Sequence, residues 1–252
     1  MSAEQTHAII LRIYPWSESS CVAVLYTRDF GKQAVLAKGA WRSRSPFEGA
    51  LDLLSICRVV FLPKAGDALG ILAEAKLVER FGAGRHDLLR LYCGFYVAET
   101  LDRFTEKGLV QPELYELGVA TLTGLCDVRQ EPRACVLRWE LQLLRLLGHQ
   151  PTLEQCAQCG NPPEQSATLV FAPVAGGIVC PACAVGLRPL IRLPSVVRDE
   201  LLRFGTPEWQ AIDTTNFNTQ HRATFRGTIE RYLTALLDRK LQLTDFLEEL
   251  AH

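Results

Sequence analysis

Short apolar segments separated by turn residues fill the first eighty residues of the chain. Segments of this length, rich in Val, Ile, Leu and Tyr and stopped by Gly, Pro or Asp, are typical of β-strands. The five expected strands are Thr6–Ile13, Ser20–Arg28, Lys32–Lys38, Leu54–Leu62 and Leu69–Glu79. Asp29-Phe30-Gly31 is a plausible hairpin turn, and Gly39–Gly49 is too polar for a strand and is expected to be a loop. This pattern predicts a small OB-type β-barrel over residues 1–80.

The apolar positions change to a helical period after residue 80. Leu88, Leu91, Phe95 and Ala98, for example, recur at the spacing of one helix face. The expected helices are Asp87–Thr105, Pro112–Cys126, Glu131–Leu147, Pro194–Phe204 and Thr219–Arg239, with a last turn at Thr244–Leu250. The fold class is therefore α+β multidomain, with the barrel followed by a helical bundle domain in two parts, 81–150 and 188–252. Residues 151–187 form a small module inserted between these parts.

The inserted module contains four of the nine cysteines, in two C-x-x-C pairs. Cys156 and Cys159 form the first pair, and Cys180 and Cys183 form the second. Two such pairs supply the four thiolates of a tetrahedral zinc site, and four protein ligands leave no position for a catalytic water. The segments Thr168–Ala172 and 178–179 are expected to pair as a hairpin. The spacing predicts a zinc ribbon with one structural Zn²⁺, whereas redox chemistry, an iron site or a degenerate ribbon are the alternatives.

The remaining cysteines occur singly in apolar surroundings, which is typical of small buried side chains. They are Cys21, Cys57, Cys93, Cys126 and Cys135. The odd total argues against a disulfide framework and favours a reducing compartment. The N-terminus lacks a basic segment followed by an apolar one, and no long uncharged apolar stretch is present, so we expect a cytoplasmic protein without a membrane span.

The charge distribution narrows the choice of partners. The formal net charge is −1, so the field of the whole molecule does not attract nucleic acid, and any DNA binding must come from a local basic patch. Residues 28–44 contain five Arg or Lys side chains against one Asp. An OB barrel binds single-stranded nucleic acid across its second and third β-strands, and two loops frame this surface. Aromatic side chains in this surface stack on unpaired bases.

We therefore expect a DNA-binding surface on this side of the barrel. Its candidate residues are Trp16, Arg28, Lys32, Lys38, Trp41, Arg42, Arg44 and Lys64. Tyr14 and Trp16 are expected in the first loop, Lys32 and Lys38 in the third strand, and Lys64 in the loop between the fourth and fifth strands. The alternative is that the two indoles pack on the barrel and the cations form a solvated loop.

The sequence contains no motif for nucleotide hydrolysis or for the common hydrolase sites. A G-x-x-x-x-G-K-[ST] phosphate loop, an H-E-x-x-H zinc motif and a G-x-S-x-G nucleophile motif are all absent. The five histidines are scattered, and no carboxylate cluster of the kind a nuclease needs is evident. We therefore expect a protein that is not an enzyme.

The order of several short motifs resembles the RecO family of bacterial DNA repair proteins, which act as recombination mediators. The motifs are Ala8-Ile9-Ile10-Leu11-Arg12, Tyr14-Pro15-Trp16-Ser17-Glu18, Phe30-Gly31-Lys32, Ala37-Lys38-Gly39-Ala40-Trp41-Arg42, Trp139-Glu140-Leu141, Leu146-Leu147-Gly148, Phe171-Ala172-Pro173, Gly176-Gly177 and the two cysteine pairs. The resemblance implies an OB domain, a helical domain and a zinc ribbon. It also implies binding to single- and double-stranded DNA, annealing of complementary strands, and loading of RecA onto strands coated with single-strand-binding protein.

The partners implied by the resemblance are RecR, the acidic C-terminal tail of single-strand-binding protein, and RecF. Such a tail needs a cation beside an apolar groove, and Arg138 and Arg145, seven residues apart on one helix, are the candidate pair; ordinary solvated arginines are the alternative. A different interpretation of the whole chain is a zinc-ribbon module for protein interaction or transcription, in which the barrel binds protein.

Overall fold

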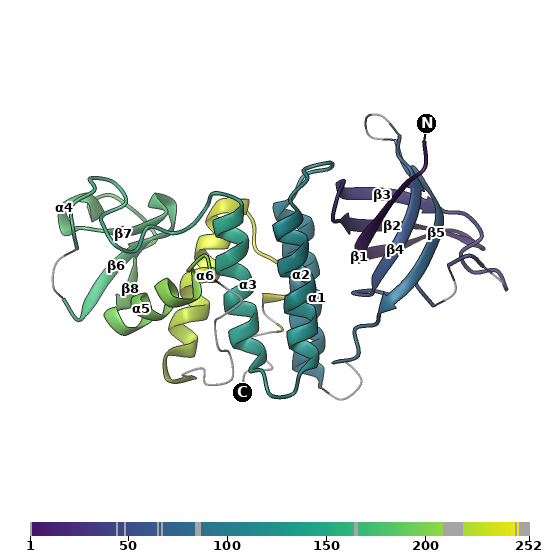
Figure 1. The fold of residues 1–252 in the computed structure, drawn as a ribbon. Helices are drawn as coiled ribbons and strands as arrows, with labels where there is room; N and C mark the ends of the chain where they lie inside the picture. The colour runs from purple at the N-terminus through teal and green to yellow at the C-terminus, as the bar shows by residue number, and fades with distance from the viewer. Residues whose placement is uncertain are drawn as a thin grey trace. The chain divides into compact units, whose positions relative to one another are not determined.

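The structure is a computed structural model that describes residues 2–43, 45–47, 49–64, 66, 68–83, 87–163, 166–208, 219–244 and 246. The chain forms two compact units, which are described separately (Figure 1). The first unit is Met1–Val128 with Phe246–His252, and the second is Arg129–Asp245. Within the described ranges, no helix is both long enough and apolar enough to cross a membrane.

The first unit contains a closed five-stranded barrel, as the sequence predicted. Its strands are β1 (Glu4–Ser17), β2 (Ser20–Thr27), β3 (Gly31–Ala37), β4 (Ile56–Leu62) and β5 (Gly70–Glu79), in the order β1-β2-β3-β5-β4. β1 is long enough to pair with β4 through its first half and with β2 through its second, with an irregularity in the register between Ile10 and Arg12. β3 and β5 are parallel and close the barrel.

Strict alternation of side chains produces the core of the barrel. Cys21, Ala23 and Leu25 on β2 are fully buried and point inward, because successive side chains of a strand face opposite sides. The small side chains of Cys21 and Ala23 leave room for Phe61, which is fully buried in the same cluster. The alternation of apolar and polar residues that predicts the strands therefore also determines which side chains fill the interior of the barrel.

The segment expected to be the first loop is part of the β1–β2 hairpin, which is a correction. Tyr14 pairs with Val22, and Ser17 pairs with Ser20, so Tyr14 and Trp16 are strand residues. Pro15 interrupts the hydrogen-bonding pattern, and the register shifts between Pro15 and Ser17. A proline is tolerated in a strand at such an irregularity, so its presence did not end the strand as the sequence suggested.

Two helices complete the first unit, α1 (Leu88–Phe104) and α2 (Pro112–Cys126), and both pack on β1. The side chain of Asp87 caps α1 by accepting a hydrogen bond from the backbone N–H of Arg90. The buried guanidinium of Arg90 donates to the carbonyl oxygens of Leu125, Asp127 and Val128 at the end of α2. This fixes the end of α2 against the beginning of α1, because buried carbonyl groups require donors.

The connection between α1 and α2 lies against β3. The backbone N–H of Gly108 donates to the carbonyl of Lys32 over 3.1 Å. The backbones of Lys107 and Lys32 form an isolated parallel β-bridge. Gly31 has a φ of +61°, and a Cβ atom there would lie 2.2 Å from the carbonyl oxygen of Leu109. The glycine is therefore required both by the backbone conformation and by the approach of the connection.

Replacing Gly31 by alanine is expected to destabilise the first unit by about 2–4 kcal/mol, since the methyl group adds a left-handed strain and a steric clash. Urea unfolding measures this change. Gly108→Ala is the matched control: Gly108 also has a positive φ, but nothing lies within 4 Å of a Cβ there. Equal losses for the two variants would show that contact with Leu109 is unimportant.

Among the residues that the structure describes, the second unit combines three longer and three short helices with a three-stranded sheet, and both can be followed in Figure 1. The helices are α3 (Pro132–Leu146), α5 (Ser195–Phe204) and α6 (Arg222–Leu237), and the short helices are η2 (Pro173–Ala175), α4 (Pro181–Ala184) and η4 (Thr219–His221). The strands are β6 (Thr168–Ala172), β7 (Gly177–Val179) and β8 (Ile191–Pro194), in the order β7-β6-β8.

The β6–β7 hairpin confirms the expected ribbon hairpin, whereas β8 was not expected. The rings of Tyr232 on α6 and Phe171 on β6 pack edge to face, with 5.8 Å between their centroids. Trp139 on α3 is fully buried. The last turn expected at Thr244–Leu250 lies mostly outside the described residues.

Candidate metal centre and nucleic-acid interface

The two C-x-x-C pairs of the second unit come together as a cluster of four sulfurs. All four Sγ atoms of Cys156, Cys159, Cys180 and Cys183 lie within 4.8 Å of one another. The first pair lies in the turn before the hairpin, and the second lies at the beginning of α4, directly after β7. In the part of the chain that the structure describes, no other group of Cys, His and carboxylate side chains gathers in this way.

The backbone around the sulfurs explains why both pairs adopt this geometry. The N–H of Gly160, a residue with a φ of +72°, donates to the carbonyl of Cys156 over 2.9 Å and closes the first turn. The N–H of Ala157 donates to the carbonyl of Ile178, which ties this turn to β7. A Cβ at Gly177 would lie 2.3 Å from the carbonyl oxygen of Thr152, so only glycine permits this approach.

The sulfurs have an uneven affinity for protons. Burial raises the pKa of Cys156, but backbone N–H groups of Cys159, Cys180 and Gln158 outweigh this effect and lower the pKa to about 6. Hydrogen bonds with the sulfurs of Cys180 and Cys159 raise the pKa of Cys183 to about 12. Four thiolates at this separation repel one another, so full ionisation of the cluster requires a cation.

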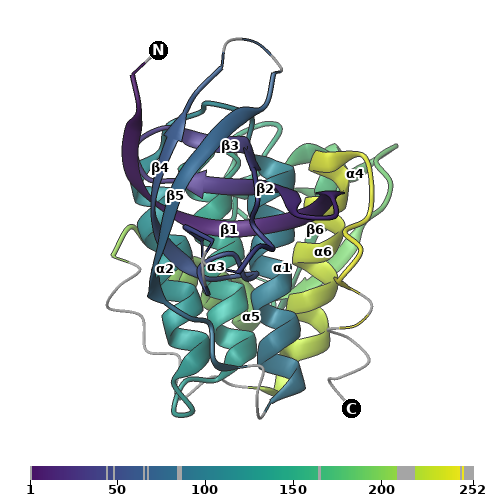
Figure 2. The ribbon, with the colours of Figure 1, turned by 90° about the vertical axis from the view of Figure 1, so that its right-hand side faces the viewer.

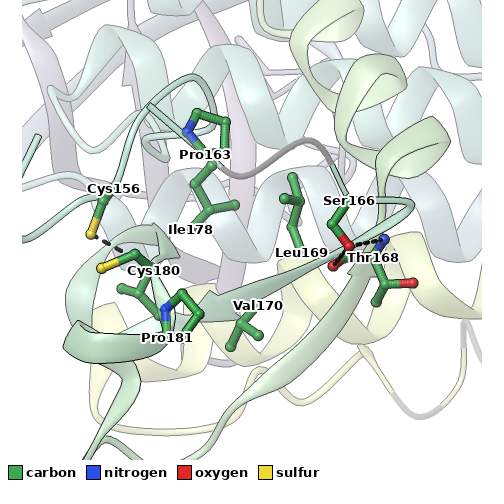
Figure 3. Close-up of a pocket in the computed structure, with 10 residues that line it drawn as sticks. Cys156, Pro163, Ser166, Thr168, Leu169, Val170, Ile178, Cys180 and Pro181 are labelled. Carbon is green, nitrogen blue, oxygen red and sulfur yellow. Dashed lines mark hydrogen bonds between the residues drawn. The ribbon is translucent and has the colours of Figure 1, made fainter. Parts of the chain in front are cut away.

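The donor set fits a metal ion. Four sulfur donors in a compact cluster suit tetrahedral coordination, and four protein ligands leave no open position for a substrate or water. The cluster can therefore hold one metal ion in a structural role. Figure 3 shows an apolar pocket next to Cys156 and Cys180, lined by Leu169, Val170 and Ile178.

The first unit exposes two indoles near the tip of the β1–β2 hairpin. Trp16 is 62% exposed and Trp41 is 51% exposed. The N–H of Trp41 donates to the carbonyl of Ser19 over 3.1 Å, which holds the loop after β3 against the hairpin tip. Lys38 and Arg42 are exposed in the same loop. An open depression beside them is lined by Ala40, Trp41, Arg42, Ser43, Ser45, Phe47, Gly49 and Leu51.

An apolar row on the outer face of the barrel was not recognised from the sequence. Tyr14 pairs with Val22, Val22 pairs with Leu36, and Leu36 pairs with Ile71, so these side chains lie side by side across four strands. The three aliphatic residues are half-buried, and Tyr14 is exposed. Alternation identified each strand, but only the register between strands shows that the four side chains form one surface.

The other candidate DNA-binding residues have different environments. Lys32 Nζ lies 3.2 Å from the carboxylate of Asp102, and Arg28 Nε lies 2.8 Å from that of Glu116. The sequence interpretation treated both cations as available, and these acidic partners were missed because they are far away in the sequence. Lys64 is exposed in the β4–β5 loop. Arg44 lies outside the described residues.

The second unit contains the two arginines proposed for a partner's acidic tail. Arg138 is only 7% exposed, and its burial lowers its pKa, so it does not present a cation to a partner as expected. Arg145 is half-buried, and its Nε donates to Gln142. A small pocket nearby has an apolar lining together with three other arginines. Its lining residues are Arg133, Leu137, Glu140, Arg222, Phe225 and Arg226.

Comparisons with known proteins cover nearly the whole chain. The family described as Recombination protein O N terminal matches residues 1–81, and the family described as Recombination protein O C terminal matches residues 85–244. A DNA repair protein RecO from Rhodopirellula baltica is 40% identical over 177 residues, which cover 70% of this chain and 65% of that protein. The alignment therefore spans slightly less than two thirds of that relative.

Two further relatives align along almost their full length. The DNA repair protein RecO of Symbiobacterium thermophilum is 28% identical over 251 residues, covering 99% of this chain and 98% of that protein. That of Listeria monocytogenes is 27% identical over 247 residues, covering 98% and 94%. Both alignments therefore run through the barrel, the helices and the cysteine cluster of this chain.

Proposed function

Because the chain belongs to the RecO family of DNA repair proteins, we propose that it is a non-enzymatic recombination mediator that binds single- and double-stranded DNA. These family matches confirm the resemblance inferred from the sequence motifs. We further propose that the protein anneals complementary strands and helps to load RecA onto strands coated with single-strand-binding protein, together with RecR and RecF.

The observation that carries the proposal is the combination of exposed indoles and exposed cations at one end of the barrel. Trp16 and Trp41 offer flat faces for unpaired bases, and such stacking contributes about 1–3 kcal/mol per base. Lys38 and Arg42 can neutralise the adjacent phosphates. The row formed by Tyr14, Val22, Leu36 and Ile71 extends this surface with apolar side chains. Lys32 is left out of the proposed surface because of its contact with Asp102.

Annealing on such a surface does not require bond-making. Two strands repel each other through their phosphates, and cations reduce this repulsion while aromatic side chains keep the bases unpaired and accessible. No step needs nucleotide hydrolysis, in agreement with the absence of a phosphate-binding loop motif from the sequence.

We propose Zn²⁺ as the metal of the cysteine cluster. Four thiolates are the usual ligands of structural zinc, and the metal would join the turn that precedes the hairpin to the short helix that follows it. Residues 151–185 contain no Lys or Arg, so the ribbon offers no phosphate contacts of its own, and its role in DNA binding would be indirect.

The pocket between α3 and α6 is the better candidate for the tail of single-strand-binding protein. Phe225 and Leu137 supply an apolar lining, and three arginines, Arg133, Arg222 and Arg226, outnumber the one lining carboxylate, Glu140. Arg133 contacts Glu131 and Arg226 contacts Glu140, so the acidic end of a peptide would share these cations with the carboxylates already present. Arg138 and Arg145 do not form this pocket.

The test of DNA binding at the barrel is the double variant Lys38→Glu/Arg42→Glu. If both cations contact phosphates of a single strand, the slope of log K against log salt should become shallower by about 1.4, at about 0.7 per contact. Oligonucleotide titrations at several salt concentrations measure the slope. Annealing of strands precoated with single-strand-binding protein, without ATP, should slow in parallel.

The matched control is Arg58→Glu/Lys76→Glu, which changes the net charge equally. Arg58 and Lys76 are exposed and pair with each other on β4 and β5, two strands that lie in front of α1 and α2 in the view of Figure 2. We expect the control to retain the slope. An unchanged slope in Lys38→Glu/Arg42→Glu would exclude this loop as the DNA surface and favour a barrel that binds protein.

A further inference from the structure

One carboxylate of the first unit holds two cations of the barrel. The carboxylate of Asp102, in the last turn of α1, lies 2.9 Å from Arg12 Nη2 and 3.2 Å from Lys32 Nζ. The side chains of Arg12, Lys32 and Asp102 are 31%, 19% and 15% exposed. This environment is drier than that of a surface ion pair, so the interaction is less screened by salt.

The two cations are held differently. Lys32 Nζ also donates to the backbone carbonyl of Asp102 over 2.6 Å, a contact that would remain without the carboxylate. Arg12 has no second contact of this kind among those found in the structure: its Nη1 donates to the hydroxyl of Tyr14 over 3.0 Å. The Asp102 carboxylate is thus the anion that contacts and neutralises Arg12, while the Tyr14 hydroxyl also helps to position the guanidinium and the nearby buried Glu99 adds to the local negative charge.

Arg12 is next to the surface proposed to bind bases. It lies two residues from Tyr14 on β1 and pairs with Val24, one row away from the row of Tyr14, Val22 and Leu36. Released from Asp102, its guanidinium would be within the footprint of a bound strand. Each cation that meets a phosphate strengthens binding and makes it more sensitive to salt.

We propose that Asp102 is an internal counterion that withholds Arg12 from nucleic-acid phosphates. This inference rests on the proposed DNA binding and concerns the regulation of the same surface. By keeping Arg12 neutralised, Asp102 lowers the electrostatic contribution to the affinity for DNA. A larger part of the binding free energy then comes from contacts with unpaired bases. Binding of this kind is easier to reverse, which suits a protein that transfers a strand to another.

The experiment compares the salt dependence of single-strand binding in the full chain and its variants. Asp102→Asn should steepen the slope of log K against log salt by about 0.7, the value for one added phosphate contact, and tighten binding several-fold at low salt. The double variant Asp102→Asn/Arg12→Gln should return to the wild-type slope. Thermal unfolding of each variant establishes that it is folded.

Two further variants make the outcome decisive. Glu116→Gln removes one negative charge from the exposed pair with Arg28. This variant should leave the slope unchanged, because an exposed ion pair is weak and its cation is already accessible to solvent ions. Arg12→Gln alone should also leave it unchanged, because Arg12 does not contact phosphate in the wild-type protein. A shallower slope in this variant would overturn the proposal even if Asp102→Asn did not fold.

The proposal is overturned if folded Asp102→Asn has the wild-type slope, or if Arg12→Gln alone makes the slope shallower. A steeper slope in Glu116→Gln equal to that of Asp102→Asn would overturn it as well, since net charge would then explain both. Failure of the wild-type protein to bind any oligonucleotide would instead reject the proposed function, and this inference with it.

Discussion

Replacement of Cys156 by serine is expected to abolish metal binding and the folded structure of residues 151–187. Cys156 is the buried member of the four-sulfur cluster, and this segment has a small apolar cluster of its own. Structural zinc contributes an apparent folding free energy of about 10–16 kcal/mol at neutral pH, which such a segment cannot replace. Elemental analysis should give close to one zinc per wild-type chain and far less for the variant.

Hydrogen exchange provides the structural half of this measurement. Amides of the β6–β7 hairpin should lose protection in Cys156→Ser and on treatment of the wild-type protein with a chelator. Cys126→Ser is the matched control, because Cys126 is a half-buried thiol outside the cluster, and it should keep both zinc and protection. A metal-free preparation with a protected hairpin would refute the structural role of the metal.

Replacement of Arg226 by methionine is expected to destabilise the second unit by about 3–5 kcal/mol. Arg226 Nη1 on α6 lies 2.5 Å from the carboxylate of Glu140 on α3, whose side chain is only 1% exposed. Methionine has a similar length but removes the cation that faces this buried carboxylate. Denaturant unfolding of the full chain measures the loss.

A double replacement separates the charge from the packing. Arg226→Met/Glu140→Leu replaces the ion pair by apolar side chains, and a buried pair can often be replaced in this way with little loss. We therefore expect the double variant to be more stable than Arg226→Met. If the two variants were equally unstable, the loss would come from packing around α6 and not from removal of the cation beside the buried Glu140 carboxylate.

The features predicted most accurately are those encoded locally. The cysteine cluster follows from two spacings of three residues, because each turn positions its own pair of sulfurs. The barrel strands follow from alternation, and their inward side chains are those that the pattern selects. Both signals lie within a few consecutive residues, so one sequence was sufficient.

The features that were missed depend on residues far apart in the chain. Lys32 meets Asp102 seventy residues later, and nothing in either local segment indicates this partner. The arginine-lined pocket of the second unit combines α3 with α6. The sequence interpretation placed both cations on one helix, and one of them, Arg138, is buried. β8 is a four-residue strand ending in proline, too short for alternation to be recognised.

The seam between β3 and β5 determines which piece of the chain can exist by itself. Only Val35, Leu36 and Ala37 pair with β5, and the first half of β3 meets the α1–α2 connection instead. A fragment cut after residue 80 would leave the Lys32 carbonyl, on the side of β3 that does not pair with β2, without that cover, and an unprotected edge of this kind recruits strands from other molecules. The smallest soluble piece that keeps the barrel intact therefore extends through the helical hairpin, past the point where barrel-like alternation ends.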